Sequence, residues 1–300
     1  NTKKIFPFFF SKKKKKKKMF SSLLAATRLA TQRSSLFFQN ARCAHTKGFF
    51  ETGSGREVPF YNVSPDYGSV KPTQSSIITY DSPTVIVLQE WWGVNDEILS
   101  QAQRIANKGY NAIVPDLYHG KKSLEIAEAE HLMNNLDWDG AVKDIAAVVE
   151  VLRAENPHRK IGIIGFCMGG ALSLAACGRL KNSNERLNAG VAFYGIPPAE
   201  LASPEQIARV GVPLQLHFGE KDVMEGFSDP KSAKAFESNL KKQGHGDHKL
   251  FIYSGQGHAF MNTSKWSKEK RVEMGLPPMD VSTIDTAWTR VFDFYDKHLN

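Results

Sequence analysis

From residue 57 onward the sequence alternates short runs of apolar, mostly β-branched residues with longer amphipathic stretches. The run TVIVLQ at 84–89 is typical of a strand buried on both faces. Strands are predicted at 84–89, 110–114, 160–164, 189–194, 213–218 and 249–253, and helices at 96–108, 124–136, 138–154, 169–180, 230–243 and 283–298. This order predicts a single α/β domain over 57–300, with a mostly parallel central sheet covered by helices on both faces. Asp137 is placed to cap the helix that follows it.

The positive net charge of the chain is concentrated at its beginning. Residues 1–50 contain ten lysines, three arginines and no acidic residue. In the rest of the chain, 26 basic residues stand against 31 acidic ones. A basic face on the folded domain would favour nucleic acid as a partner, but a basic tail does not. We therefore expect no nucleic-acid partner.

Two segments before residue 51 are interpreted separately from the folded domain. The unbroken lysine run Lys12–Lys18 directly precedes Met19, so 1–18 is either untranslated message read through or a nuclear-targeting or polyanion-binding tail, and we favour the first. Residues 19–50 are rich in Ser, Ala, Leu and Arg and lack acids, as a mitochondrial transit peptide does. We place its cleavage between about residues 42 and 50 and exclude the segment from the fold. The alternative is a disordered tail on a cytoplasmic protein.

Several classes of site and protein are disfavoured by what the sequence contains. The three cysteines, Cys43, Cys167 and Cys177, show no CxxC spacing, so neither a disulfide framework nor a zinc site is expected. His245 and His248 resemble a ligand pair without a third ligand, so we predict no metal. No phosphate-binding loop follows a predicted strand, and no apolar run reaches about 18 residues. We therefore expect no cofactor and no membrane span.

The string KIGIIGFCMGG at 160–170 runs from a predicted strand through Gly-X-Cys-X-Gly into a predicted helix. This is the context of a nucleophile elbow, in which Gly165 and Gly169 avoid backbone collisions and the central side chain is lifted clear of the sheet. The elbow places Cys167 at a helix N-terminus, which favours a thiolate, and turns the Met168 amide toward a developing oxyanion. The alternative is a glycine-rich turn with an incidental buried cysteine. Cys177 lies inside the helix and is expected in the core.

Two later residues complete a candidate catalytic triad. Asp222 follows the strand predicted at 213–218, and His258 lies in a glycine-flanked turn after the strand at 249–253. In nucleophile-elbow hydrolases the acid and the base follow the nucleophile in this order. Taken singly, the aspartate is typical of a turn and the histidine is usually structural. The order of all three predicts that His258 moves the proton and Asp222 orients its imidazole.

The loop after the first predicted strand contributes a further acid and two indoles. Glu90 is expected to face the pocket, and the Trp91 N–H is the candidate for the second oxyanion donor. Trp91 and Trp92 either form an apolar wall that desolvates Glu90 or simply pack in the core.

Four motifs resemble the dienelactone hydrolase family, also called carboxymethylenebutenolidase-like proteins. They are QEWWGVN at 89–95, PDLY at 115–118, GFCMGG at 165–170 and GHAF at 257–260, and the resemblance covers about 75–298. It implies an α/β-hydrolase fold, no cofactor, and a Cys–Asp–His triad at Cys167, Asp222 and His258. It also implies that Glu90 contacts the thiol and helps to activate it when substrate arrives. Cys167 would be acylated and the resulting thioester hydrolysed by water.

The chain departs from the family pattern at two positions that bind the substrate carboxylate. The family's arginine after PDLY is replaced by His119, Gly120 and Lys121, and the arginine after the catalytic histidine by Met261 and Asn262. Lys121 can replace an arginine only as a point charge. We therefore expect a hydrolase of small esters or lactones, without predicting dienelactone itself. The alternative is a catalytically idle α/β-hydrolase fold that serves as a binding module, and in either case we expect a monomer.

Overall fold

The computed structural model describes residues 45–51, 57–66, 79, 81–182 and 185–300. The predictions for the lysine-rich segment at 1–18 and for most of the proposed transit peptide, 19–44, lie outside these residues. In the described part of the chain, no helix has the length and apolar character needed to cross a membrane.

The elements alternate along the chain as the sequence predicts. The strands are β1 (His45–Glu51), β2 (Glu57–Val63), β3 (Thr84–Leu88), β4 (Asn111–Pro115), β5 (Ile161–Phe166), β6 (Ala189–Phe193), β7 (Leu214–Gly219) and β8 (His248–Tyr253). The helices are α1 (Asp96–Ala106), α2 (Ile126–Asn134), α3 (Trp138–Glu155), α4 (Met168–Arg179), α5 (Pro204–Val210), α6 (Pro230–Lys242), α7 (Lys265–Glu273) and α8 (Val281–Leu299). All six predicted strands and all six predicted helices are present, with boundaries shifted by one or two residues. The predicted cap is confirmed, because the Asp137 side chain accepts a hydrogen bond from the Gly140 amide at the start of α3.

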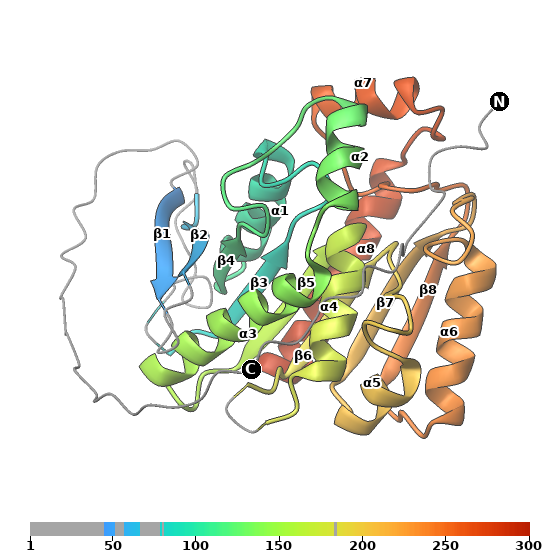
Figure 1. Ribbon diagram of the computed structural model, residues 1–300. Helices are drawn as coiled ribbons and strands as arrows, with labels where there is room; N and C mark the ends of the chain where they lie inside the picture. Colours follow the sequence, from blue (N-terminus) through green and yellow to red (C-terminus); the bar gives the residue numbers. More distant parts are fainter. Residues whose placement is uncertain (1–44, 52–56, 67–78, 80, 183–184) are drawn as a thin grey trace, which may run out of the picture. The chain divides into compact units, whose positions relative to one another are not determined.

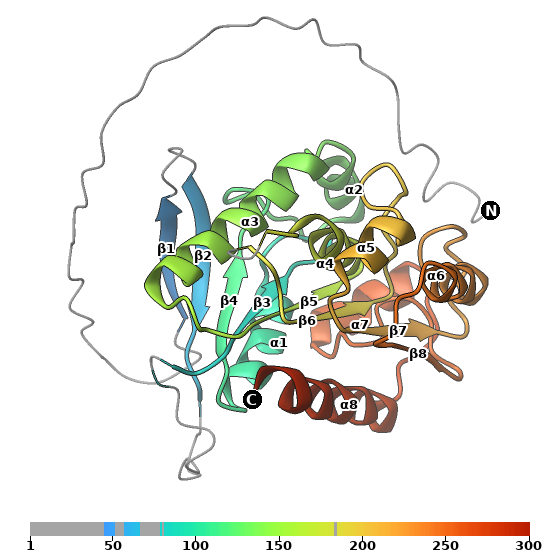
Figure 2. The same ribbon diagram turned by 90° about the horizontal axis from the view of Figure 1, so that it is seen from below.

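One eight-stranded sheet forms the centre, in the order β1-β2-β4-β3-β5-β6-β7-β8. The strands β3 to β8 are parallel, and β1 and β2 are antiparallel additions at one edge. Figures 1 and 2 show helices on both sides of this sheet, with α3, α4 and α5 on one face and α1 and α8 on the other. Because successive strand residues point to opposite faces, Ile86 and Leu88 pack with the first group of helices and Val85 and Val87 with the second. The predicted layered α/β class is confirmed.

The folded domain begins before the predicted boundary at residue 57. The strand β1, at 45–51, lies inside the range assigned to the transit peptide, and it pairs along its whole length with β2. The rings of Phe50 and Phe60 stack across this pair with centroids 4.0 Å apart. This strand was not predicted because it directly follows a basic segment and was assigned to it. The elements β2, α5 and α7 were not predicted either, because they are short or lack a clear apolar period.

Candidate active site

The predicted nucleophile elbow is present between β5 and α4. Cys167 has φ 53° and ψ −116°, in the sparsely populated region that such a turn requires, and its side chain is buried. A β-carbon at Gly165 would overlap the carbonyl of Gly169, and one at Gly169 would lie 2.6 Å from the carbonyl oxygens of Leu88 and Gln89. Both glycines are therefore needed where the sequence predicts them. Cys177 is fully buried in α4, as expected of a core residue.

Strained backbone gathers at the carboxyl edge of the parallel strands. Of the described residues other than glycine, those with positive φ are His119, Cys167, Tyr194 and Ala259. Each follows a parallel strand, namely β4, β5, β6 and β8 in that order. A non-glycine residue in this region costs of order 1–3 kcal/mol, and such residues concentrate at functional sites. The strain therefore marks the same edge of the sheet as the candidate triad.

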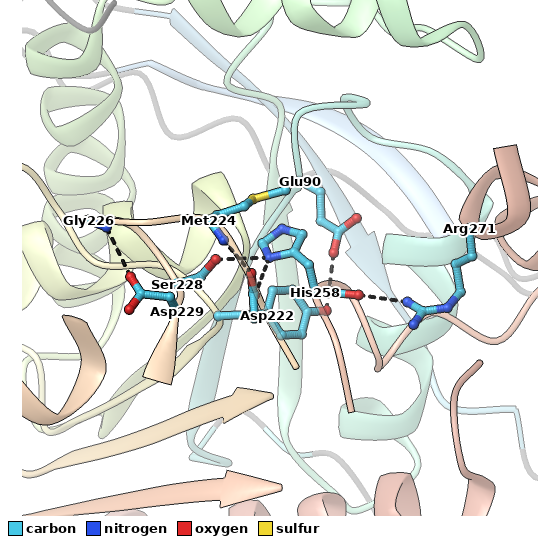
Figure 3. Close-up of polar contacts among 9 residues, drawn as sticks. Glu90, Asp222, Met224, Gly226, Ser228, Asp229, His258 and Arg271 are labelled. Atoms are coloured by element: carbon cyan, nitrogen blue, oxygen red, sulfur yellow. Dashed lines mark hydrogen bonds and ion pairs between the residues drawn. The ribbon is translucent and has the colours of Figure 1, made fainter. Parts of the chain in front are cut away.

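The structure brings Asp222 and His258 together. The Asp222 carboxylate Oδ2 lies 2.7 Å from His258 Nδ1, and its Oδ1 accepts a hydrogen bond from the Met224 amide at 3.1 Å (Figure 3). Both side chains are buried. A carboxylate held at both oxygens fixes the orientation of the imidazole.

Cys167 and His258 interact electrostatically across the site. Burial disfavours the charged imidazole, but the negative charges of Asp222 and of a Cys167 thiolate raise the pKa of His258 well above its usual value. A hydrogen bond between the Cys167 and His258 side chains acts in the same direction and also raises the pKa of His258. Because Asp222 engages Nδ1, Nε2 is the imidazole nitrogen that faces Cys167.

Opposing effects act on the ionisation of the Cys167 thiol. Burial raises the pKa of Cys167 above its ordinary value, whereas His258 and the Met168 N–H act in the opposite direction. The Met168 N–H thus acts as the helix terminus predicts, and burial is the larger effect. The placement of the Met168 amide beside the sulfur agrees with its expected role as an oxyanion donor.

Glu90 lies in the site but uses its oxygens elsewhere. The Tyr194 hydroxyl donates to Oε1 at 3.1 Å, and the Asn262 amide donates to Oε2 at 2.8 Å. Burial raises the pKa of Glu90, and its charge in turn opposes ionisation of Cys167. The contact with the thiol that the family resemblance implies is not among the hydrogen bonds of the described residues.

The two indoles after β3 are packed in the core. Their rings meet edge to face with centroids 4.9 Å apart, and Trp92 also meets Trp266 at 5.0 Å. Both indoles belong to the buried core, so core packing is confirmed, and Glu90 next to them is also buried. Because β3 pairs directly with β5, with Leu88 opposite Gly165, the backbone of Trp91 lies at the same sheet edge as the elbow.

Sequence reasoning missed four residues that hold the site together. They are Tyr194, Ser228, Asn262 and Arg271. Ser228 Oγ lies 3.1 Å from His258 Nδ1, and Arg271 donates to the His258 carbonyl at 2.7 Å (Figure 3). Tyr194 directly follows a buried parallel strand, and that position was an available signal. Arg271 lies on a mostly polar helix and gave none.

The geometry offers no metal site among the residues that the structure describes, where no group of three or more His, Cys, Asp or Glu side chains is arranged to hold an ion. The His245 and His248 rings instead lie with Nδ1 atoms 3.2 Å apart, and His245 Nε2 bonds the Val212 carbonyl at 2.9 Å.

Comparisons with known proteins agree with this arrangement. The model of the dienelactone hydrolase family matches residues 70–299. Protein usf of Aquifex pyrophilus is 31% identical over 229 residues, covering 73% of this chain and 90% of the relative. The carboxymethylenebutenolidase homolog of Homo sapiens is 26% identical over 254 residues, covering 82% and 92%. The crystal structure of a dienelactone hydrolase-like promiscuous phosphotriesterase from metagenomic libraries is 18% identical, with a TM-score of 0.62 over 87% of this chain and 100% of that one.

The last of these comparisons concerns the fold alone, and it agrees with an α/β-hydrolase architecture. The family model spans nearly the whole domain, and it supports the activity of a carboxylic ester or lactone hydrolase. The predicted resemblance is confirmed: the chain belongs to the dienelactone hydrolase family.

Proposed function

We propose that this hydrolase cleaves small esters or lactones through an acyl-thioester on Cys167, with His258 and Asp222 as the other members of a triad. One observation carries the proposal. A nucleophile-type turn presents a buried thiol to an imidazole whose other nitrogen is 2.7 Å from a buried carboxylate. A thiol, an imidazole and an orienting carboxylate are the parts that nucleophilic acyl transfer needs.

In the acylation step the thiol proton passes to Nε2 of His258 as Sγ forms a bond to the acyl carbon. The carbonyl oxygen becomes an oxyanion, and the backbone N–H groups of Met168 and Trp91 are its proposed donors. Collapse of this intermediate breaks the acyl C–O bond. His258 returns its proton to the leaving oxygen, and an alcohol or enol is released.

In the second step the thioester is hydrolysed. His258 takes a proton from water as the oxygen attacks the thioester carbon, and the C–S bond then breaks. The proton returns to Sγ and the carboxylic acid leaves. Asp222 stabilises the imidazolium in both steps without taking the proton itself.

We assign Glu90 to activation of the neutral thiol. Its raised pKa makes it a better proton acceptor than an ordinary carboxylate, and neutralising it removes a charge that opposes the thiolate. Substrate that competes for the hydrogen bonds from Tyr194 and Asn262 would free the carboxylate to accept one from Cys167.

The substrate we propose has an uncharged acyl part. In place of the family's second arginine stand Met261 and Asn262, and the Asn262 amide is already committed to Glu90. A carboxylate on the substrate would therefore meet the Glu90 carboxylate, and the nearby Arg271 guanidinium is already engaged by the carbonyls of His258 and Pro277. Lys121, after PDLY, lines a separate hollow of about 360 Å³ between α2 and α3.

Import into mitochondria is a further proposal, and it rests on the composition of residues 19–44. Imaging of the full chain fused to a fluorescent protein, with and without 19–44, tests it. A cytoplasmic signal from both fusions would contradict it. Sedimentation of the purified protein tests the expected monomer.

The decisive experiment compares the full chain with Cys167→Ala, and uses Cys177→Ala as the matched control on the same helix. Initial rates are measured on p-nitrophenyl acetate and on a dienelactone, across pH. We expect Cys167→Ala to lose at least about 100-fold in kcat and Cys177→Ala to keep its rate. Equal rates in all three proteins would exclude the cysteine mechanism. Absence of turnover in the unaltered chain would favour the binding module.

A further inference from the structure

We infer that Ser228 is a positioning residue for His258, a second acceptor for the Nδ1–H proton held beside Asp222. The inference rests on the proposed function, because it gives Ser228 a role through the general base. It goes beyond the triad, since neither the order of the motifs along the chain nor the family resemblance assigns a role to Ser228.

Two oxygens approach the same ring nitrogen. Asp222 Oδ2 lies 2.7 Å from His258 Nδ1, and Ser228 Oγ lies 3.1 Å from it. Figure 3 shows both side chains converging on this nitrogen. Ser228 is fully buried, so water does not compete for the contact.

The proton on Nδ1 follows from the chemistry of the partners. An ionised carboxylate has no proton to give, so at 2.7 Å Nδ1 must be the donor to Asp222. Ser228 Oγ therefore approaches a nitrogen that already carries its hydrogen, and it accepts a share of that hydrogen. In the neutral imidazole this tautomer leaves Nε2 free of a proton, as a general base for Cys167 requires.

The turn that carries Ser228 is firmly built. The Ser228 amide donates to the Met224 carbonyl at 3.0 Å, and the next residue, Asp229, caps α6. The Phe227 carbonyl accepts from the Ile196 amide at 2.9 Å, which ties the turn to the segment after β6. The hydroxyl is thus held toward the imidazole by the backbone, as a positioning residue should be.

Other charged and titratable groups also act on the imidazole and must stay unchanged in a test. They come from five places: Asp222 after β7, Cys167 at the elbow, Glu90 after β3, Tyr194 after β6 and Arg271 on α7. Substitution of Ser228 alters none of them. A change in the behaviour of His258 in such a variant is therefore assignable to the lost acceptor.

The first test compares Ser228→Ala with Ser232→Ala in the full chain. Ser232 Oγ accepts a hydrogen bond from the Gly226 amide in the same turn, so it controls for loosening of the turn. We expect Ser228→Ala to lower kcat about 3- to 10-fold with KM unchanged, as loss of one ordinary hydrogen bond predicts when Asp222 still holds the same proton. Ser232→Ala should keep the kcat of the unaltered chain.

A second readout needs no turnover. The rate at which iodoacetamide alkylates Cys167, measured across pH and corrected with Cys167→Ala, reports the thiolate paired with imidazolium. Loss of an acceptor destabilises imidazolium, so at neutral pH alkylation should slow in Ser228→Ala. This readout separates the two proposals, because a chain without esterase activity would contradict the proposed function and still test Ser228.

The third test uses the Asp222→Ala background. There Ser228 is the remaining acceptor for Nδ1, so we expect Ser228→Ala to cost more than it does beside Asp222. Ser228→Cys, which is close in size but a weak acceptor, should match Ser228→Ala and guards against a folding defect. The inference is overturned if Ser228→Ala behaves as Ser232→Ala does, or if its cost is equal or smaller in the Asp222→Ala background.

Discussion

The loop that carries Cys167 and the loop that carries His258 are held in place by different means. The elbow at 165–170 is fixed by backbone packing within a few residues, where the glycines leave no room for a β-carbon. The segment at 256–264 is held by hydrogen bonds from side chains on α1 and α7. The Cys167 loop is thus constrained by steric packing of its backbone, and the His258 loop by hydrogen bonds.

The supports of the His258 loop are distant in sequence. Gln101 on α1 donates to the Met261 carbonyl at 2.8 Å, and Glu97 on the same helix accepts from the amides of Thr263 and Ser264 at 2.8 and 2.9 Å. Arg271 donates to the carbonyls of His258 and Pro277. A steric overlap at the elbow would disrupt the whole turn, whereas the hydrogen bonds of the His258 loop can be removed one at a time. Mutations at the elbow should therefore cost more free energy of unfolding than mutations at the His258 loop.

The largest effect is expected from Gly165→Ala. The new methyl group would overlap the Gly169 carbonyl, so the turn or α4 must move. We expect destabilisation of about 4 kcal/mol or more, seen as loss of soluble protein or as a large fall in the urea midpoint. Gly255→Ala is the control, because it has positive φ but open space around it and should cost only about 1 kcal/mol. Gly165 itself does not have a positive φ, so similar losses in both variants would contradict overlap with the Gly169 carbonyl as the dominant cost.

Arg271→Met should have the next largest effect. It leaves two buried carbonyls, those of His258 and Pro277, without their donor. We expect about 2–4 kcal/mol of destabilisation together with a lower kcat, measured by urea unfolding and by ester hydrolysis. Arg271→Lys should recover part of the loss, since a lysine cannot span both carbonyls as the guanidinium does.

Arg209→Met serves as a surface control for that experiment. Arg209 is exposed and pairs with Glu205 one helical turn away, so its loss should stay within about 0.5 kcal/mol. An Arg271→Met protein as stable as Arg209→Met would show that the His258 loop does not depend on the buried guanidinium.

The same contrast explains what the sequence could predict. The strand periods, the glycines around Cys167 and the cap at Asp137 are local features, and each lies where the sequence places it. The positions of Asp222 and His258 follow from strand order, because parallel strands end at one edge of a sheet. Local backbone geometry and the order of the strands could therefore be predicted from the sequence.

The residues that hold the site in place could not be predicted from the sequence, for a physical reason. The contacts of Ser228, Asn262 and Arg271 join residues that are far apart in the sequence and are not related by a helix or strand period. The sequence also does not show whether a polar side chain faces water or a buried carbonyl. The burial that raises the pKa of Cys167 was equally absent from the sequence, because the helix terminus is a local feature whereas desolvation depends on how the whole domain closes over the sulfur.

Glu97→Gln should cost less than loss of the guanidinium. Besides the two backbone amides, the carboxylate accepts a hydrogen bond from the Ser267 hydroxyl at 2.9 Å. Glutamine keeps one acceptor oxygen and turns an NH₂ group toward donors. We expect about 1–3 kcal/mol of destabilisation by urea unfolding, with a lower kcat as the Asn262 segment loosens. An unchanged midpoint would indicate that Gln101 and Arg271 hold the loop without Glu97.

Glu90→Gln should give the smallest change, and with the opposite sign. Burial raises the folded-state pKa of Glu90 above its ordinary 4.5, so the unfolded chain ionises first and stability is lost as the pH rises from 4.5 toward the folded-state pKa. Glutamine removes that loss; it still accepts from Tyr194, and Asn262 can turn its amide oxygen toward the new NH₂. We expect Glu90→Gln to melt at a higher temperature than the unaltered chain at pH 7, with a smaller gap at pH 4.5, and to lose activity. A lower melting temperature at both pH values would mean that Glu90, like Glu97, is a structural acceptor and not a strained catalytic carboxylate.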